Sequence, residues 1–382
     1  MNIELLTDHT ADQPQTFPEG SFLQSECWAS FKSQYGWSYL RFFCAPDDTD
    51  EEFPSFILTV LMRSIPFFGT LCYIPGGPET SARDEQHQGR VLAEIACKLR
   101  RYLPVDVICV RFDPLWEIKE HTDCSDSGLL TVPVRRYIPA SKLLRKAETD
   151  IQPPDTVILD LTPSPDEILA SMKPKCRYNC KLGQKKGLVI RCIERIQDIP
   201  EALTVFYSLY EETAKRDGIA IHSKQYYLDL FETIHRCEHQ SGQIRISIRM
   251  YIAEHESVPI ASIIVLLYGS EAVYLYGASS NSKRNLMPAY ALQWQAICDA
   301  RDAGCVTYDF YGIPPTNDPE HPMYGLYRFK TGFGGWIVHR PGSYDAPINR
   351  IRYILFVCAQ KARTVWFKKI VKKLRKGIRH SS

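Results

Sequence analysis

The sequence predicts an α/β protein with mixed sheets that is divided into two domains. Runs rich in β-branched and aromatic residues alternate with helical segments in both halves of the chain. Strands and helices mixed in this way indicate layers of sheet and helix. A polar, proline-containing stretch at 147–155 separates the halves as a linker does. The halves have similar lengths and a similar order of elements, although no repeat of fixed period relates them.

The first half contains three predicted strands and one predicted helix. The strands are 37–43, 56–61 and 105–112, and the helix is 88–102. In this helix Val91, Ile95 and Leu99 recur every four residues, which marks one apolar face.

The second half begins with a predicted strand at 156–161. Ser164 and Pro165 follow it as a helix start, with Ser164 as the N-cap and Pro165 in the first helical position. The remaining predicted helices are 199–216 and 290–303, and the remaining strands are 245–253, 259–267, 272–279 and 306–311.

The composition favours a folded protein of the cytoplasm. The 382 residues suffice for two or three domains, and 45% are hydrophobic. The first fifteen residues are polar and acidic, so no secretory signal is expected. The longest apolar run, near 263–267, is far shorter than the roughly 20 residues of a membrane span. Cys176 and Cys180 are close in sequence, but no second pair completes a zinc site, and no metal is predicted.

Basic residues are concentrated in the tail. Residues 361–382 carry nine Lys/Arg and no acid, whereas the rest of the chain carries 37 basic and 44 acidic side chains, a net charge of −7. The segment 351–379 has helical periodicity with one apolar face and a basic remainder. Either this helix packs on the body with its charges in water, or it contacts a membrane or a nucleic acid.

Three segments combine residue types that could support chemistry, although the sequence has no P-loop, no G-x-S-x-G and no H-E-x-x-H motif. In 326–335, Lys330 lies among aromatics before glycines. It could stabilise an oxyanion, or it could simply snorkel to water. Asp113 ends a buried strand, where functional carboxylates are common. It could instead pair with Arg111 or cap a turn. The segment 171–186 carries six basic residues and no acid, which suits tRNA phosphates as well as a solvated helix.

Taken in order over about 20–340, the sequence resembles the Fem family of peptidoglycan-bridge aminoacyltransferases. The segments that carry the resemblance are GSFLQSECWASFKSQYGW (20–37), YIPGGP (73–78), RFDP (111–114), the basic segment 171–186, YEETAKRDGIAIHSKQYY (210–227), YLYGASSNSKRNLMPAYALQWQAI (274–297), YDFYGI (308–313) and LYRFKTGFGG (326–335). Their joint order and spacing make the match specific, whereas no one of them is decisive.

The resemblance implies two GNAT-like acyltransferase domains. The first is 1–155, completed by a returning C-terminal segment at 345–382, and the second is 156–344. It also implies a reaction in which a side-chain amine of the precursor stem peptide attacks the ester of an aminoacyl-tRNA. The expected partners are therefore aminoacyl-tRNA as co-substrate, with no other cofactor, and lipid II or UDP-MurNAc-peptide as acceptor. Glycine, alanine and serine all fit as the transferred residue, and the basic tail at 361–379 favours a peripheral contact with the inner face of the plasma membrane.

The resemblance assigns roles to six residues by position. Lys330 matches the lysine that stabilises the tetrahedral oxyanion, and Asp113 matches a carboxylate proposed as base. Lys32 matches a lysine that binds the diphosphate of the precursor, and His222 falls where some members have an arginine for that task. Tyr226 and Tyr276 match tyrosines of the substrate pocket.

The tRNA contact is predicted from charge, with Lys175, Arg177 and Lys181 as candidates. Staphylococcal members carry a long helical arm in the second domain, but here only 232–244 separate Phe231 from the strand at Arg245, so no such arm fits.

Three alternative functions stay open. The first is an acyl-CoA-dependent N-acyltransferase, although 284–289 lacks the glycines of a pyrophosphate turn. The second is a non-catalytic membrane-surface protein, and the third is a tRNA-dependent transferase that acts on protein N-termini.

Overall fold

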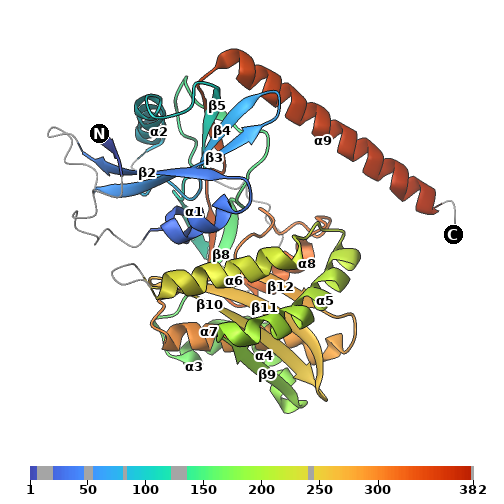
Figure 1. Cartoon of the computed structure of the whole chain (residues 1–382). Helices are drawn as coiled ribbons and strands as arrows, with labels where there is room; N and C mark the ends of the chain where they lie inside the picture. The colour runs from blue at the N-terminus through green and yellow to red at the C-terminus, as the bar shows by residue number, and fades with distance from the viewer. Residues whose placement is uncertain (7–19, 47–54, 81–83, 122–135, 240–244, 380–382) are drawn as a thin grey trace. The chain divides into compact units, whose positions relative to one another are not determined.

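The computed structural model describes all residues except 7–19, 47–54, 81–83, 122–135, 240–244 and 380–382, and it describes the side chains of the last helix only as far as Trp366. The contacts among these residues divide the chain into two compact units (Figure 1). Unit 1 comprises Met1–Trp116, Tyr137–Gln152 and Pro341–Ser382, and unit 2 comprises Glu117–Arg136 and Pro153–Arg340.

Unit 1 is built on a mixed sheet. Within the described residues its strand order is β1 (Asn2–Leu5), β2 (Ser38–Ala45), β3 (Phe56–Ile65), β4 (Gly69–Ile74), β5 (Val107–Phe112), β15 (Tyr344–Pro347) and β7 (Arg145–Lys146). β4 and β5 are parallel, and the other neighbours are antiparallel. The helices are α1 (Glu26–Ser33), α2 (Glu85–Leu99) and α9 (Arg350–Arg379), and Phe22–Gln24 form a 3₁₀ turn.

Two helical layers cover the sheet of unit 1. On one face Val91, Leu92, Ile95 and Leu99 of α2 pack against strand residues such as Phe42 and Val110. On the other face, Ala29 of α1 and Phe356 of α9 contact separate smaller clusters. Alternate residues of each strand point to opposite faces, so this sheet is buried on both sides over much of its area.

Unit 2 contains the second mixed sheet. Within the described residues its order is β6 (Ile118–His121), β14 (Trp336–His339), β8 (Asp155–Asp160), β13 (Thr307–Asp309), β12 (Glu271–Ser279), β11 (Val258–Tyr268), β10 (Ile246–His255) and β9 (Leu188–Ile193). Only β12 and β13 are parallel among these neighbours. The helices are α3 (Pro165–Ser171), α4 (Pro174–Lys185), α5 (Ile199–Asp217), α6 (Lys224–Glu238), α7 (Pro288–Asp302) and α8 (Tyr324–Thr331), and 3₁₀ turns occur at Ile196–Asp198 and Arg284–Leu286.

Helices cover both faces of the second sheet as well. α5 and α6 lie over one face, and α3, α4 and α7 share the core of the other (Figure 1). The strand β11 illustrates why both faces are covered. Its residues Ile263, Val265 and Leu267 pack in the core shared with α7, and the residues between them point to the opposite face. The predicted α/β class with mixed sheets is therefore confirmed.

Most predicted elements form close to their expected bounds. The helix start is confirmed in detail, since Ser164 caps α3 and Glu167 closes the capping box. The last predicted strand is shorter than expected, because β13 ends at Asp309 and the chain turns at Tyr311 with φ 58°. Lys330 itself is helical, since α8 runs through to Thr331 before the glycines.

The segment that follows Trp116 differs from the predicted domain boundary. The prediction places all of 1–155 in the first domain, yet β6 (Ile118–His121) pairs with β14 in unit 2. Pairing between segments so distant in the chain leaves no local pattern, so the sequence could not indicate it. None of the helices in the part of the chain that the structure describes combines the length and apolar content of a bilayer span.

Candidate active site

Lys330 lies in the last turn of α8 and is buried, at 5% exposure. Its Nζ donates hydrogen bonds to the carbonyl oxygens of Tyr311, at 3.0 Å, and Gly312, at 2.8 Å. The same Nζ lies 5.3 Å from the centre of the Tyr274 ring. Lys330 is thus held inside unit 2, and the alternative of a lysine that snorkels to water is wrong.

The turn that receives Lys330 has a strained backbone. Tyr311 has φ 58°, the left-handed region that residues with a side chain rarely adopt. Its N–H donates to Oδ1 of Asp309 at 2.7 Å, and Asp309 also accepts from the hydroxyl of Thr156. Strain of this kind persists where surrounding contacts enforce it, which is common at functional sites. Here it turns the Tyr311 and Gly312 carbonyls toward Nζ.

Burial lowers the pKa of Lys330 to about 7, and the nearby Asp309 carboxylate opposes this shift. Desolvation disfavours the charged form of any amine. The two carbonyl acceptors act in the opposite direction, because they bind the ammonium form. A lysine with this pKa has substantial populations of both protonation states near neutral pH.

The two predicted pocket tyrosines meet in unit 2. Tyr226 of α6 and Tyr276 of β12 share a hydrogen bond, and Tyr226 is buried. Burial raises the pKa of Tyr276 well above its usual value, and the phenols of Tyr226 and Tyr311 raise it further. Tyr276 therefore remains a protonated donor. Tyr311, whose carbonyl accepts from Lys330, is thus within electrostatic range of Tyr276.

His222 lies beside the same tyrosines. Its exposed ring stacks on Tyr226 with centroids 3.9 Å apart and planes 11° apart, and its carbonyl accepts from the hydroxyl of Tyr207 at 3.2 Å. Three predicted residues, Tyr276, Tyr226 and His222, thus form a connected series, and Lys330 lies in the same unit. The sequence did not indicate the contacts of Lys330 with Tyr311 and Tyr274, because only the fold shows which carbonyls and rings a lysine reaches.

Lys32 lies in α1 of unit 1, with Nζ 5.7 Å from the Trp28 ring and 5.8 Å from the Phe31 ring. Burial lowers its pKa, and the charge of Arg63 lowers it further. Arg63, in β3, lies over the Trp37 ring at 5.5 Å. Two like charges near aromatic rings repel each other in the absence of an anion, and a diphosphate would relieve this repulsion. Arg63 had no signal in the sequence.

Asp113 is buried at 4% exposure just after β5. It accepts hydrogen bonds from the Tyr73 hydroxyl, at 2.5 Å, from the Ser343 hydroxyl, and from the Gln152 N–H, at 3.4 Å. Burial raises the pKa of Asp113, and these hydrogen bonds oppose the shift. All these partners belong to unit 1, so the contacts favour a structural role for this carboxylate.

Arg111, the alternative partner expected for Asp113, forms a different ion pair. Its Nε and Nη2 bind Asp345 of β15 at 2.7 and 2.8 Å, and both side chains are buried. This bidentate pair joins β5 to β15 and satisfies both charges. The expected ion pair between Asp113 and Arg111 is therefore wrong, because Arg111 binds Asp345 instead.

Most of the basic segment 171–186 forms α4 (Pro174–Lys185). Its apolar face, which includes Cys176 and Cys180, packs into the core with α7. Lys175 and Lys181 are exposed, as is Tyr178 at 63%, while Arg177 is half-buried and donates to the Ala170 carbonyl at 3.0 Å. The helix is confirmed, and its role in binding tRNA stays a prediction.

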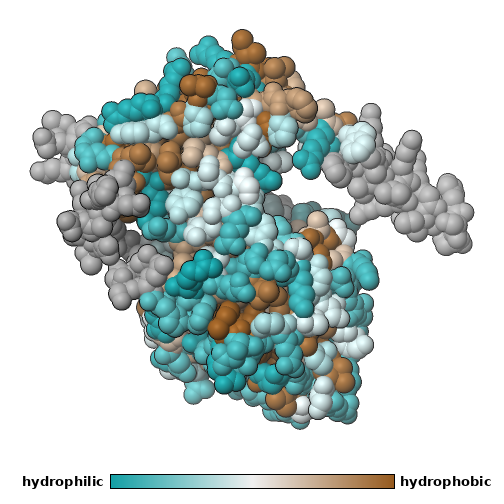
Figure 2. All heavy atoms as spheres, viewed as in Figure 1, coloured by the Kyte–Doolittle hydropathy of each residue, from teal (hydrophilic) through white to brown (hydrophobic). Residues whose placement is uncertain are grey.

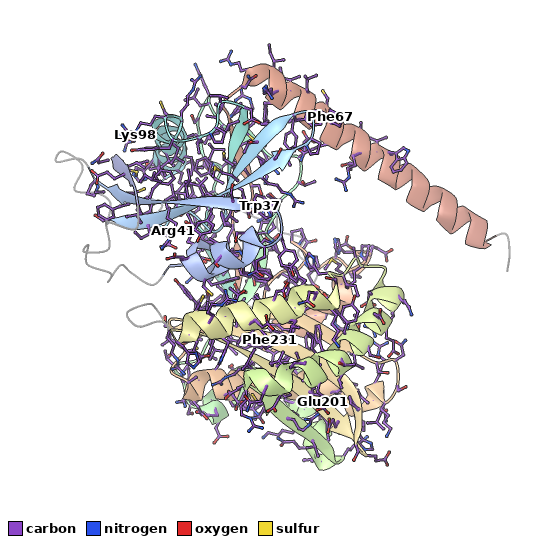
Figure 3. The ribbon with its side chains drawn as sticks, viewed as in Figure 1. Trp37, Arg41, Phe67, Lys98, Glu201 and Phe231 are labelled. Carbon is purple, nitrogen blue, oxygen red and sulfur yellow. The ribbon has the colours of Figure 1, made fainter. Side chains whose placement is uncertain are left out.

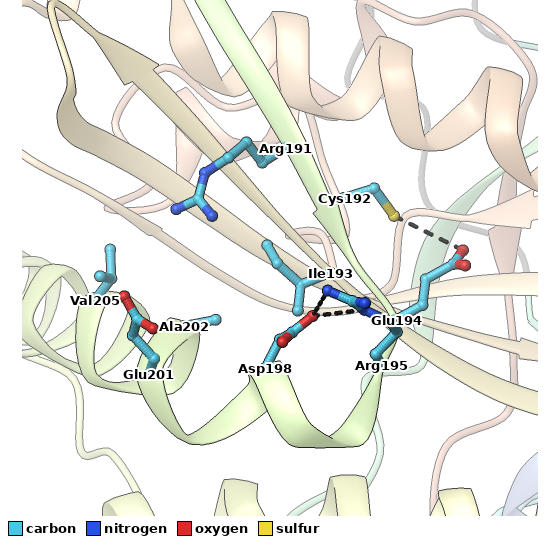
Figure 4. Close-up of a pocket in the computed structure, with 9 residues that line it drawn as sticks. All are labelled: Arg191, Cys192, Ile193, Glu194, Arg195, Asp198, Glu201, Ala202 and Val205. Carbon is cyan, nitrogen blue, oxygen red and sulfur yellow. Dashed lines mark hydrogen bonds and ion pairs between the residues drawn. The ribbon is translucent and has the colours of Figure 1, made fainter.

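Figure 4 shows a polar cavity of about 590 Å³ at the β9 edge of unit 2. Its walls come from 191–205, and it contains none of the predicted site residues. Arg195 pairs with Asp198 at 2.7 Å, and Arg191 pairs with Glu254 at 2.7 Å. Both arginines are paired with carboxylates and are exposed, so neither is a buried cation like Lys330.

One cluster in the described residues has metal-ligating types at close range. The ligand atoms of His235, Glu238 and His239 lie within 4.8 Å of one another at the end of α6. Glu238 and His239 are exposed, and Nδ1 of His239 is already hydrogen-bonded to the His235 carbonyl at 2.8 Å. None of these three residues is among the predicted site residues.

The chain matches the model of the FemAB family over residues 141–239 and 232–361, more than half of its length. It is 24% identical over 423 aligned residues to "Lipid II:glycine glycyltransferase" of Staphylococcus aureus (strain USA300), with 95% of this chain and 96% of that protein covered. The protein of the same name from strain Mu50 / ATCC 700699 matches with the same identity and coverage.

A solved structure titled "Crystal structure of FemX" shares the fold, with a TM-score of 0.68 and 20% identity over 94% of this chain and all of that chain. The family match covers the segments that carry Lys330, Tyr276, Tyr226 and His222. The chain therefore belongs to the FemAB family and is an aminoacyltransferase that adds an amino acid to a peptidoglycan precursor.

Proposed function

We propose that this chain moves glycine, alanine or serine from aminoacyl-tRNA to the side-chain amine of the stem peptide of lipid II, and so forms an interpeptide bridge. The observation that carries the proposal is Lys330, a buried lysine oriented by two carbonyl oxygens in a FemAB family member. The curated relative that matches over nearly the whole chain is named for lipid II as acceptor and for glycine.

The role assigned to Lys330 follows from its hydrogen bonds. An ammonium group has three donors, and the carbonyls of Tyr311 and Gly312 take two of them. We assign the third to the oxygen that becomes negative when the amine attacks the ester. A donor oriented in advance in a dry site stabilises such charge far better than water does. The ester is already activated, so the remaining demand is a neutral, aligned amine.

We assign binding of the precursor to two groups. Lys32, with the exposed Arg63 within electrostatic range, would bind the diphosphate, because two cations match its charge. Tyr226 and Tyr276 would line the pocket for the stem peptide, with the stacked His222 at its rim. A histidine is a weaker phosphate partner than the arginine of some family members, because a neutral imidazole offers one N–H donor and no charge.

We assign the tRNA contact to the exposed face of α4. Lys175 and Lys181 supply charge for phosphates, and the exposed Tyr178 between them offers a ring on which a base could stack. Both kinds of contact are typical of proteins that bind RNA without reading a duplex groove.

The test is incubation with a set of charged tRNAs and either lipid II or UDP-MurNAc-peptide, followed by measurement of the product mass. We expect a single added residue that depends on one charged tRNA and is lost in Lys330→Ala. Acetyl-CoA replaces tRNA in a parallel reaction. Transfer from acetyl-CoA alone would support the acyl-CoA-dependent alternative and overturn the proposal.

A further inference from the structure

One corner of unit 1 exposes apolar side chains to an unusual extent. Phe67 lies at the tip of the β3–β4 hairpin and is 102% exposed, and Val105 lies in the turn before β5 and is 104% exposed. Single exposed apolar residues are ordinary, but both of these project fully from loop tips. Phe67 also has φ 70°, a strained value for a phenylalanine, and is held there in the turn.

Hydrogen bonds join these two tips to each other and to the start of α9. Thr70 of the hairpin donates from its N–H and its hydroxyl to Asp106, at 3.1 and 3.0 Å. Nη1 of Arg352 in α9 donates to the Phe68 carbonyl at 2.9 Å. Figure 3 shows Phe67 beside the first turns of this helix. The three segments therefore form one surface.

α9 adds a second set of apolar groups to this surface. Phe356 is buried against the sheet, which fixes the face of the helix that points inward. The exposed apolar residues on the helix are Ile351 at 73%, Ile354 at 60%, Leu355 at 55%, Val365 at 52% and Trp366 at 60%. The first three recur at helical spacing and lie away from Phe356, so they form a stripe that faces outward. Figure 2 shows apolar residues over this end of unit 1.

The charge around the apolar groups is mostly basic, with Asp106 and Glu148 as acidic neighbours. No acidic residue follows Asp345, and 350–379 contain eleven Lys/Arg. Arg100 and Arg101 precede Val105 and are exposed. The rest of the chain carries more acidic than basic residues, so the net positive charge of this part stands out. A surface that combines exposed apolar groups with basic residues matches an anionic bilayer.

We propose that unit 1 docks on the surface of an anionic phospholipid bilayer through the bilayer-docking surface formed by Phe67, Val105 and the outward stripe of α9. The apolar side chains enter the acyl–headgroup boundary, and the basic residues contact the lipid phosphates. RNA would account for the basic residues alone, but Val105, Ile351 and Leu355 have no function against a phosphate backbone. The proposal deepens the proposed function, because docking would bring the enzyme to a lipid-linked acceptor.

The test is sedimentation of the full chain with vesicles of phosphatidylcholine alone or mixed with phosphatidylglycerol. We expect binding only to the anionic vesicles, weakened by salt. The double variant Phe67→Ser/Val105→Ser should bind about ten- to a hundredfold more weakly, as expected when two apolar side chains no longer insert. Val258→Ser is the matched control, because Val258 is 53% exposed at a strand start in unit 2. Its binding should not change.

Unchanged vesicle binding in Phe67→Ser/Val105→Ser, with unchanged thermal unfolding, would overturn the docking surface. Equal binding to neutral vesicles would overturn the role of the basic residues. Loss of tRNA affinity in the double variant, with vesicle binding intact, would make this an RNA contact instead. Transfer to detergent-solubilised lipid II, which needs no bilayer, is measured in parallel and separates the two proposals. Docking without this transfer refutes the proposed function alone, and transfer without docking refutes the docking surface alone.

Discussion

At the scale of single residues, the burial of Lys330 decides what the candidate site can do. Its ammonium group has exchanged water for two carbonyl oxygens and the face of Tyr274. The loss of water lowers its pKa to about 7, and the two carbonyls fix the direction of its remaining donor. The consequences can be measured separately in catalysis and in stability.

In catalysis, Lys330→Ala should lower kcat about 10²- to 10³-fold and change the KM for the precursor little. The hydrogen bond that this variant removes is one that we assign to the transition state, so ground-state binding should survive. Steady-state kinetics with saturating aminoacyl-tRNA measure both constants. A rise in KM as large as the fall in kcat would show that Lys330 serves binding instead.

In stability, Lys330→Met should remove a pH dependence of the free energy of unfolding. Between about pH 7 and 10.5 the unfolded chain binds the lysine proton and the folded chain does not, so the stability of the natural protein rises with pH in this window. The full effect is about 5 kcal/mol for a shift from 10.5 to about 7. Urea unfolding at pH 6.5 and 9.5 measures most of this effect. An equal rise in the variant would contradict the shifted pKa.

In precursor binding, Arg63→Ala should raise the KM for the precursor about ten- to a hundredfold and leave kcat nearly unchanged, as expected for loss of a charge-assisted hydrogen bond. Lys32→Ala should behave alike. Lys98→Ala is the control, since Lys98 is a unit 1 lysine of α2, the helix on the other face of the sheet. An unaltered KM in both Arg63→Ala and Lys32→Ala would refute the assignment of the diphosphate to these cations.

At the scale of elements, α4 shows how one helix can serve both the core and a partner. Cys176, Asn179, Cys180 and Gly183 form the buried side, and Gly183 lets α4 approach Ala291 of α7, because an added Cβ would lie 3.3 Å from the alanine methyl. The N–H of Lys173 donates to the Gly332 carbonyl at 3.0 Å, so the start of α4 is tied to the segment just after Lys330. A partner bound to the exposed side of α4 would therefore contact a helix that is directly connected to the segment of Lys330.

For this helix, Lys175→Glu/Lys181→Glu should weaken tRNA binding and reduce the slope of log affinity against log salt by about one for each phosphate that is no longer neutralised. Filter binding with charged tRNA at several salt concentrations measures the slope. Lys215→Glu is the matched control, because Lys215 is exposed on α5, over the opposite face of the sheet. A slope that stays constant in the double variant would place the tRNA elsewhere.

At the scale of the whole molecule, the chain leaves unit 1 and returns to it. β15 lies between β5 and β7 in the first sheet, although it follows the whole of unit 2 in sequence. The buried pair of Arg111 and Asp345 fixes it there, and Tyr353 of α9 also donates to Asp345 at 3.2 Å. Unit 1 therefore depends on the C-terminal residues for an interior strand of its sheet.

The expected consequence is a sharp difference between two truncations. A chain that ends at Arg340 loses β15 and leaves the buried Arg111 without its carboxylate, a loss that costs about 3–5 kcal/mol for the charge alone. It should fail to fold unit 1. A chain that ends at Trp366 keeps β15 and Phe356 and should unfold at nearly the Tm of the full chain. Circular dichroism on heating compares them, and a stable chain ending at Arg340 would refute this dependence.

The sequence by itself determined the elements and their class, because helical periodicity, strand alternation and the Ser164 cap are local properties of the chain. It also located the basic tail and the segment around Lys330. Only the tertiary structure decided which groups meet: the carbonyls of Tyr311 and Gly312 on Lys330, Arg63 beside Lys32, and β15 between β5 and β7. Those contacts join residues that are distant in the chain, and they arise from packing and hydrogen bonding that no local pattern records.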